Sequence, residues 1–283
     1  MSERRLLGAH VSITGGVGNA PLRQEEIGGT CGQIFVSSPR SWAVPTPAPT
    51  EVARFRNMRA ELDQGPYAVH VTYLVNLAAS SQEVRKRSLS ALQAEVDAAA
   101  AYGAEYVVLH PGAATGAASR EEGMHAIVSG IDALSIPSGT MLLLETMSGK
   151  GTTIGTTAEE LGALIDAAAA TGALGVCLDT CHAFCAGYPL HTADGLSEML
   201  DSFEDAVGME AVRLVHCNDS KHPFRSGKDE HAHIGWGHIG VDAFRHIVNE
   251  PRLRRRPFVL ETPVEDGYGH AEDISFVRSL YED

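Results

Sequence analysis

The sequence predicts an α/β protein, a single (β/α)8 TIM barrel with its active site at the C-terminal face of the strands. Eight short runs rich in valine, isoleucine and leucine recur along the 283 residues, and longer segments of helical character separate them. Strands that alternate with helical crossovers lie parallel, and eight such units in about 250 residues are typical of a closed barrel. No linker or shift in composition divides the chain, so residues 1–283 are expected to form one domain.

Each apolar run marks one expected strand. The runs are LLGAHVS near residue 6, CGQIFVSS near 31, YAVHVTYL near 67, EYVVLHPG near 105, TMLLLETMSG near 140, LGVCLDTCH near 174, VRLVHCNDS near 212 and PFVLETP near 257. The proline-rich stretch at 45–50 predicts a loop that leads into a helix beginning near Glu51. Helices are also predicted over 83–103 and 157–172, because both segments end in glycine, which commonly terminates helices.

The acidic composition bears on the class of partner. The net charge is −14, whereas a nucleic-acid binder usually presents a basic patch. That count covers the whole chain, however, and three bound Zn²⁺ ions would add six positive charges and change −14 to −8. Five cations follow strand ends and are expected at the mouth of the barrel: Arg40, Lys150, Lys221, Arg225 and Lys228. The basic run at 252–257 precedes the eighth strand, so it is expected at the opposite end.

Cysteine usage and the N-terminus predict a cytoplasmic protein. The five cysteines form no C-x-x-C pair, and their odd number indicates no framework of disulfides, which favours a reducing compartment. The N-terminal segment carries two arginines but no apolar stretch long enough for a signal peptide. No run approaches the ~18 apolar residues of a membrane span, so no membrane partner is expected.

The ends of the expected strands carry the chemistry. Six successive strands, the third to the eighth, end in histidine, aspartate or glutamate, and the loop after the seventh strand adds two more candidates. These nine residues are His70, His110, Glu145, Asp179, His182, His216, Asp229, His231 and Glu261. The C-terminal ends of barrel strands face one mouth, so the nine side chains should converge. Imidazole and carboxylate together suit Zn²⁺, or Mn²⁺ as a harder alternative, and nine ligands fit two or three ions better than one.

Each of these residues, taken alone, also has an ordinary structural interpretation that involves no metal. A single strand histidine usually packs, and a strand-end carboxylate often caps the next helix; only the run of six strands favours ligation. Among the other candidates, His10 is expected to support a ligand, while His233 and His238 are left open. Five histidines are expected at the surface: His125, His191, His222, His246 and His270. Cys177, Cys181 and Cys185 are expected to pack, with metal ligation as the open alternative.

Six motifs run almost from end to end of the chain: GAHVSITGGVGNA, HVTYLVNLA, LHPG, LDTCHAFCAGY, HCNDSK and HIGWGHIG. Together they resemble the endonuclease IV family (AP endonuclease family 2), the zinc-dependent apurinic/apyrimidinic endonucleases of base-excision repair. The resemblance implies three zinc ions, with Mn²⁺ possible at one site. His70, His110 and Glu145 would hold the first ion; Glu145, Asp179, His216 and Glu261 the second; His182, Asp229 and His231 the third.

The resemblance also implies the reaction and the substrate. The family hydrolyses the DNA phosphodiester 5′ to an abasic site, which leaves a 3′-hydroxyl and a 5′-deoxyribose phosphate. Glu145 and Glu261 would be the catalytic carboxylates, and Arg40, Tyr73 and Leu74 would enter the DNA at the lesion. The expected partner is double-stranded DNA with abasic sites, bound by a monomer without an obligate protein partner. The chain departs from the family at Glu230, where arginine is common.

A metal-dependent sugar isomerase or epimerase on a similar barrel is the alternative function. Four of the candidate ligands, Glu145, Asp179, His216 and Glu261, would suit that chemistry, because they can hold one divalent ion together with a diol. The five further ligands distinguish the two hypotheses, above all His182 with the Asp229 and His231 pair. A non-catalytic DNA-binding protein is disfavoured because a pure binder needs no open metal positions.

Overall fold

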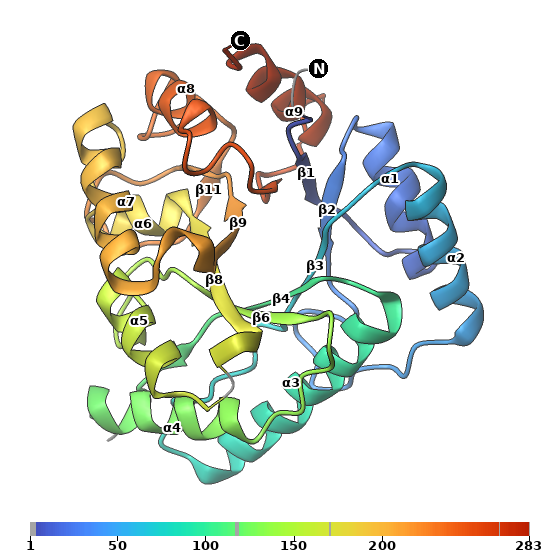
Figure 1. Ribbon diagram of the computed structural model, residues 1–283, viewed down its shortest axis with the longest axis vertical. Helices are drawn as coiled ribbons and strands as arrows, with labels where there is room; N and C mark the ends of the chain where they lie inside the picture. Colours follow the sequence, from blue (N-terminus) through green and yellow to red (C-terminus); the bar gives the residue numbers. More distant parts are fainter. Residues whose placement is uncertain (1–3, 117–118, 170, 266, 283) are drawn as a thin grey trace.

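Parallel strands close into a barrel, as the sequence predicts (Figure 1). The computed structural model describes residues 4–116, 119–169, 171–265 and 267–282, and within them eight strands form the barrel. They are β1 (Leu7–His10), β2 (Cys31–Ile34), β3 (Tyr67–His70), β4 (Tyr106–Leu109), β6 (Met141–Glu145), β8 (Leu174–Asp179), β9 (Val212–His216) and β12 (Phe258–Leu260). They follow one another around the barrel in chain order, and β12 closes it by pairing with β1.

Helices surround the barrel on the outside (Figure 1). They are α1 (Ala20–Glu26), α2 (Pro49–Glu61), α3 (Gln82–Tyr102), α4 (Arg120–Asp132), α5 (Ala158–Ala167), α6 (Thr180–Ala186), α7 (Ala193–Val207), α8 (Val241–Asn249) and α9 (His270–Ser279). Three short 3₁₀ turns, η1 (Val17–Asn19), η2 (Thr171–Ala173) and η3 (Met209–Ala211), complete the connections. No helix in the described parts of the chain is both long enough and apolar enough to cross a membrane.

The two predicted helices that end in glycine have different outcomes. Helix α3 stops where predicted, because Gly103 takes the left-handed conformation with φ 75° that closes the helix. The helix predicted over 157–172 is wrong at its C-terminal end. Helix α5 stops at Ala167, since Ala168 is extended at ψ 144°, and the amide of Ala169 donates to the Asp132 carboxylate instead of continuing the helix.

Two short antiparallel ribbons lie in the loops that follow the barrel strands. One pairs β5 (Gly112–Ala113) with β7 (Thr153–Ile154), and the other pairs β10 (Asp219–Ser220) with β11 (His231–Ala232). The second ribbon folds the loop after β9 back on itself. It therefore fixes the backbone of His231, one of the candidate ligands, beside the carboxyl ends of the strands.

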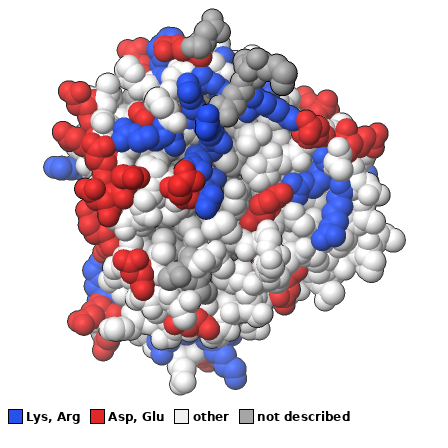
Figure 2. Space-filling model, viewed as in Figure 1, with Lys and Arg blue, Asp and Glu red and all other residues white. Residues whose placement is uncertain are grey.

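The basic run before β12 forms ion pairs with acidic residues. The guanidinium of Arg252 lies 2.6 Å from Asp201 and 2.9 Å from Glu250, and that of Arg256 lies 3.0 Å from Glu210. On the face shown in Figure 2, basic side chains gather toward the top, near the chain termini, and acidic side chains line the left edge.

Candidate metal centre

An apolar layer fills the barrel interior, and the candidate ligands stand directly above it. Seven buried residues, one from each of seven strands, form this layer: Cys31, Ala68, Val108, Leu143, Cys177, Leu214 and Val259. Side chains two apart on a strand point to the same face. The residue two positions after each of these is respectively Gln33, His70, His110, Glu145, Asp179, His216 and Glu261. The pleat of the strands thus directs six candidate ligands into the barrel axis at its carboxyl end.

Glu145 lies at the centre of the cluster and contacts histidines from three other strands. Its Oε2 atom lies 3.4 Å from Nε2 of His70 and 3.1 Å from Nε2 of His110. Its Oε1 atom lies 3.0 Å from Nδ1 of His216. Burial by itself raises the pKa of Glu145, but His216 and His110 oppose burial and hold that pKa well below its usual value. The carboxylate is therefore ionised and serves two groups of ligands at once.

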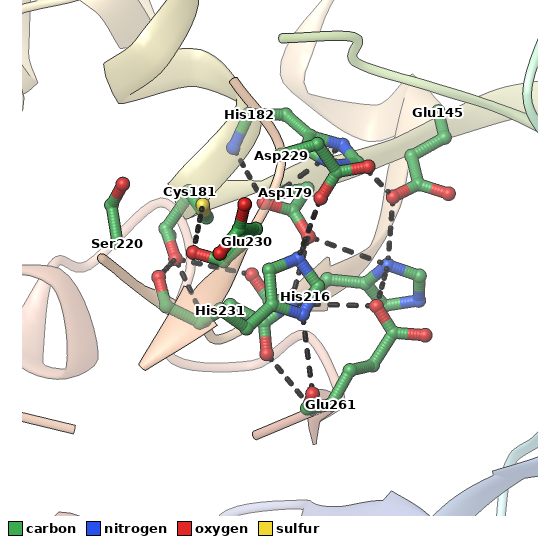
Figure 3. A network of polar contacts seen from close by, with 12 residues as sticks. Glu145, Asp179, Cys181, His182, His216, Ser220, Asp229, Glu230, His231 and Glu261 are labelled. Carbon is green, nitrogen blue, oxygen red and sulfur yellow. Dashed lines mark hydrogen bonds and ion pairs between the residues drawn. The ribbon is translucent and has the colours of Figure 1, made fainter. Parts of the chain in front are cut away.

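His216 joins the carboxylates of three strands (Figure 3). Its Nδ1 atom lies 3.3 Å from Oε2 of Glu261 and 3.7 Å from Oδ2 of Asp179, in addition to the Glu145 contact. Glu145, Asp179, His216 and Glu261 each offer a donor atom, and these atoms lie within 4.8 Å of one another. Such a set of one imidazole and three carboxylates can hold a divalent ion.

A third group forms where α6 meets the loop after β9. Oδ1 of Asp229 lies 3.0 Å from Nε2 of His182 and 3.3 Å from Nε2 of His231. Asp179 orients His182, because its Oδ1 accepts the backbone amide of His182 at 2.7 Å and caps helix α6. Burial lowers the pKa of His231 while Asp229 raises it, and the net effect is a pKa of about 9. Asp179, Cys181 and His231 also lie close enough to share an ion, so the cysteine alternative keeps a geometric basis.

In the described residues, three buried ligand atoms make no hydrogen bond of good geometry: Oε2 of Glu145, Nε2 of His182 and Nε2 of His231. Their contacts at 3.0–3.4 Å are with other candidate ligands. A buried polar atom without a partner costs free energy, on the order of 1–3 kcal/mol. Bound cations at these positions would be coordinated by all three atoms. The residue types and their unused lone pairs therefore both fit metal ions.

Two amide side chains that the sequence analysis did not single out hold the ligands in place. Oε1 of Gln33 lies 2.8 Å from Nε2 of His216. The amide nitrogen Nε2 of Gln33 donates to Oε1 of Glu261 at 2.6 Å. Asn218 donates to Oδ2 of Asp179 at 2.8 Å and accepts the backbone amide of Glu261 at 2.8 Å. Gln33 occupies Nε2 of His216 and thereby leaves Nδ1 of that ring for the carboxylate group.

The remaining histidines have different outcomes, and His125, His191 and His246 are exposed as expected. His10 lies 3.4 Å from Oε1 of Glu261 and 3.0 Å from Nε2 of Gln33, in the supporting position expected of it. The expectation that His222 and His270 are surface residues is wrong. His222 is half-buried against Glu230, and His270 is half-buried with Nε2 3.0 Å from the carbonyl of Thr262. Loops fold over both rings, which a strand-and-helix pattern does not reveal.

The mouth opens into a cavity of about 540 Å³ beside the ligands. Tyr73 lines it and is 59% exposed, and Leu74 is half-buried. Arg40 is exposed on the neighbouring loop. The two loops are tied together, because the amide of Tyr73 and the hydroxyl of Thr72 both donate to the carbonyl of Pro39. The three residues predicted to contact DNA therefore lie on two linked loops at the rim.

Comparison with known proteins agrees with this site. Residues 23–280 match the family model described as a xylose isomerase-like TIM barrel. The probable endonuclease 4 of Natronomonas pharaonis is 44% identical over 277 residues, which cover 98% of this chain and 99% of that protein. The crystal structure of endonuclease IV from Thermus thermophilus has a TM-score of 0.84 at 37% identity and covers 98% of this chain and 97% of its own. A D-tagatose 3-epimerase-like protein has a TM-score of 0.69 at 18% identity over 96% of each chain, a likeness that shows the fold alone.

The barrel, the clustered donors at its mouth and these relatives together define an enzyme, a hydrolase of the nuclease class. More narrowly, the chain belongs to the endonuclease 4 family of the xylose isomerase-like TIM barrels. The resemblance found in the motifs is thereby confirmed. The sugar isomerase or epimerase alternative shares the fold, whereas the relatives at high identity over the whole chain are named as endonucleases.

Proposed function

We propose that the protein repairs DNA by hydrolysing the phosphodiester 5′ to an abasic site, with three zinc ions held by the nine candidate ligands. The products would be a 3′-hydroxyl and a 5′-deoxyribose phosphate. The observation that carries the proposal is the set of three contiguous donor groups around Glu145, which opens into the cavity that Tyr73 lines. The relatives named as endonucleases support a nucleic-acid substrate for that cavity.

The donor groups divide in the way expected for three ions. His70, His110 and Glu145 form one group; Glu145, Asp179, His216 and Glu261 a second; His182, Asp229 and His231 a third. Bound zinc would supply Lewis acidity to phosphate oxygens and lower the pKa of water toward about 7. Glu145 belongs to two of the groups, so its two oxygens would bridge them. The positive charge of the ions would also offset the acidity of the chain at the point where the phosphate binds.

Glu261 is the carboxylate that we assign to orienting the attacking group. Its side chain is partly exposed at the mouth, whereas Glu145 is fully buried. Gln33 donates to Oε1 of Glu261, and Asn218 holds its backbone amide. The opposing His216 and His10 overcome the effect of burial and hold the pKa of Glu261 well below its usual value, so the carboxylate stays ionised. A fixed and charged oxygen at the cavity wall suits this role.

Recognition of the lesion is assigned to Arg40, Tyr73 and Leu74. Tyr73 is exposed although its ring contacts Phe35 and His70 edge-on, at centroid distances of 5.5 and 5.6 Å. These contacts support the ring from below and leave its outer part free. An apolar wedge of this kind fits the gap that a missing base leaves in the stack, where unstacking costs least.

The proposal is tested with a duplex oligonucleotide that contains one tetrahydrofuran abasic analogue. The wild-type protein should nick the strand on the 5′ side of the analogue. Glu261→Gln should fold and yet lose most of this activity, because the amide keeps the shape and removes the charge. Glu265→Gln, which changes an exposed carboxylate on the same loop, is the matched control and should nick as the wild type does. Nicking by Glu261→Gln at the wild-type rate would remove Glu261 from the mechanism.

The number and identity of the ions need a separate measurement. Elemental analysis of protein purified without chelator should find about three zinc ions per chain, since nine ligands supply three to four donors per ion when one is shared. One ion or fewer in fully active protein would contradict the three-ion centre. The monomeric state and the cytoplasmic location remain predictions from the sequence.

A further inference from the structure

A cluster of aromatic rings stands on the rim of the mouth, outside the donor groups. Trp236 is 63% exposed, and its ring lies 4.6 Å from that of Tyr268 and 4.9 Å from that of His233. His233 also packs edge-on against Tyr268 at 4.5 Å. Tryptophan buries a large apolar area when it can, so a tryptophan that is mostly exposed beside two other rings calls for an occupant.

The backbone around Trp236 is held by hydrogen bonds to one buried carboxylate. Oδ2 of the buried Asp219 accepts the amides of Gly235 and Gly237, each at 3.0 Å, and Oδ1 accepts the amide of Ile239 at 2.9 Å. A Cβ on Gly237 would stand only 2.3 Å from the carbonyl oxygen of Ser220, so this close approach requires glycine. Hydrogen bonds on both sides of Trp236 to one carboxylate thus fix the backbone from which the exposed indole projects.

A second buried carboxylate fixes the ring beneath. Oδ2 of Asp273 lies 2.8 Å from Nδ1 of His233 and accepts the hydroxyl of Thr262 at 2.6 Å, and Oδ1 accepts the amide of Ile234 at 3.1 Å. Asp273 therefore joins helix α9 to both loops that carry the aromatic rings. A rigid surface of this kind loses little conformational entropy when a ligand stacks on it.

The aromatic cluster adjoins the candidate metal centre. Trp236 lies five residues after the ligand His231 on the loop that follows β9, and Tyr268 lies seven residues after the ligand Glu261 on the loop that follows β12. The cavity beside the ligands is lined by Pro263 on this side and by Tyr73 from the loop after β3. The loop that carries Tyr268 therefore contributes Pro263 to the wall of this cavity, and the loop that carries Trp236 contributes Glu230 and His231.

The charges on the segments that carry these rings disfavour a contact with the phosphate backbone. Segments 229–244 and 257–277, which carry the rings, contain no lysine or arginine. Among their described residues, four exposed carboxylates are not candidate ligands: Glu230, Asp242, Glu265 and Glu272. Repulsion from those carboxylates disfavours phosphate, whereas the uncharged face of a nucleobase is attracted to an indole by stacking. The exposed rings of Trp236 and Tyr268 therefore suit stacking against a nucleobase.

We propose that Trp236 and Tyr268 form a binding site for an unpaired nucleobase of the substrate DNA, an inference that rests on the proposed function. In an intact duplex each base face is covered by its neighbours. At an abasic site the opposite base has lost its pairing partner and leaves the stack at lower cost, and the bases that flank the gap are also more easily unstacked. Once unstacked, a base from either source presents an open ring face. The site would thus add affinity for damaged DNA through stacking, without cations.

Equilibrium binding to a duplex with one tetrahydrofuran analogue tests this site. Trp236→Ala should weaken binding about 5- to 100-fold, the range measured for loss of base–aromatic stacking, and Trp236→Phe should restore most of it. Trp236→Leu should not restore it, because leucine keeps apolar area without a ring. The slope of log affinity against log salt should stay unchanged in all three variants, since no phosphate contact is lost.

Val264→Ala is the matched control, because Val264 is 71% exposed on the loop of Tyr268 and carries no ring. It should bind as the wild type does. An equal loss of affinity in Val264→Ala, or full binding by Trp236→Leu, would overturn stacking. So would an unchanged affinity of Trp236→Ala, or a change only in self-association measured by sedimentation, which would mark a contact between copies of the chain.

A second duplex distinguishes the two sources of the base and separates this site from the proposed function. In that duplex the position opposite the analogue is also abasic. If the effect of Trp236→Ala disappears there, the platform holds the opposite base; if it persists, the platform holds a flanking base. Wild-type nicking of the first duplex is measured in parallel. Nicking by the wild type with unaltered binding by Trp236→Ala refutes the platform alone, whereas no nicking by the wild type refutes the proposed function.

Discussion

Glu95 gives the stability of the protein a pH dependence that can be worked out from the structure. This glutamate of helix α3 is fully buried under the loops that carry Arg40 and Tyr73. Its Oε1 accepts the hydroxyl of Ser37 at 3.2 Å, and its two oxygens lie 3.3 and 3.2 Å from the amide of Thr72. Burial raises the pKa of Glu95 to about 7, although these hydrogen bonds oppose the shift.

The sign of the effect follows from the two states of the chain. In the unfolded chain Glu95 has its ordinary pKa of 4.5, so it releases its proton at a lower pH than in the folded protein. The free energy of unfolding therefore falls as pH rises from about 4.5 to about 7 and is level above that range. One pKa unit corresponds to about 1.4 kcal/mol, so the loss is on the order of 3 kcal/mol. Below pH 4.5 both states are protonated and the penalty vanishes.

Glu95→Gln isolates this contribution, because the amide cannot ionise. Urea unfolding of the wild type and of Glu95→Gln at pH 5, 6, 7 and 8 gives the difference in unfolding free energy at each pH. Relative to the wild type, the variant should gain about 2–3 kcal/mol between pH 5 and pH 8. Glu83→Gln, an exposed site on the same helix, should give a difference that is independent of pH. A difference that is likewise flat for Glu95→Gln would refute the assignment of the raised pKa to Glu95.

Three further predictions test the ligands, the rim and the base of the barrel. His182→Ala should reduce the metal content by about one ion while circular dichroism stays that of the folded barrel; an unchanged metal content would remove His182 from the ligand set. Gly237→Ala should lower the free energy of unfolding by about 1–3 kcal/mol, because its Cβ would collide with the carbonyl of Ser220; denaturation at wild-type urea concentrations would contradict that. Arg252→Ala should cost about 1 kcal/mol or less by loss of a surface ion pair with Asp201, with nicking unaffected, and reduced nicking would show that this end of the barrel contributes to function.

The barrel and most of its mouth could be predicted because both depend on local patterns. Apolar runs at regular intervals define the strands, and the last residues of those strands share one chemistry. The alternation of side chains along the strands would also have identified residues that support the ligands. Counting two residues beyond the inward-facing Cys31 leads to Gln33, and two beyond Gly8 leads to His10. Both side chains contact Glu261, so period-two counting would have identified these supporting residues.

Other parts of the site depend on contacts that no local pattern contains. Asn218 follows a strand end, but only the fold shows that its amide joins Asp179 to the backbone of Glu261. Helix α5 is shorter than its sequence predicts because Asp132, 37 residues away from Ala169, accepts the amide that would have continued it. Glu95 resembles a solvent-exposed helix residue in the sequence, yet two loops from other strands cover it. In each case the deciding hydrogen bond joins segments that are distant in the chain.

The rim around Trp236 shows how such distant bonds create a functional surface. The segment HIGWGHIG is rich in glycine, which is typical of a loop. In the fold, Asp219 and Asp273 bind the amides at 234, 235, 237 and 239, and the glycines permit the close approach that these bonds need. Two buried carboxylates therefore hold this loop in place, while the side chain of Trp236 stays exposed. Rigidity and exposure together, rather than the presence of a tryptophan, are what make this rim a candidate for base recognition.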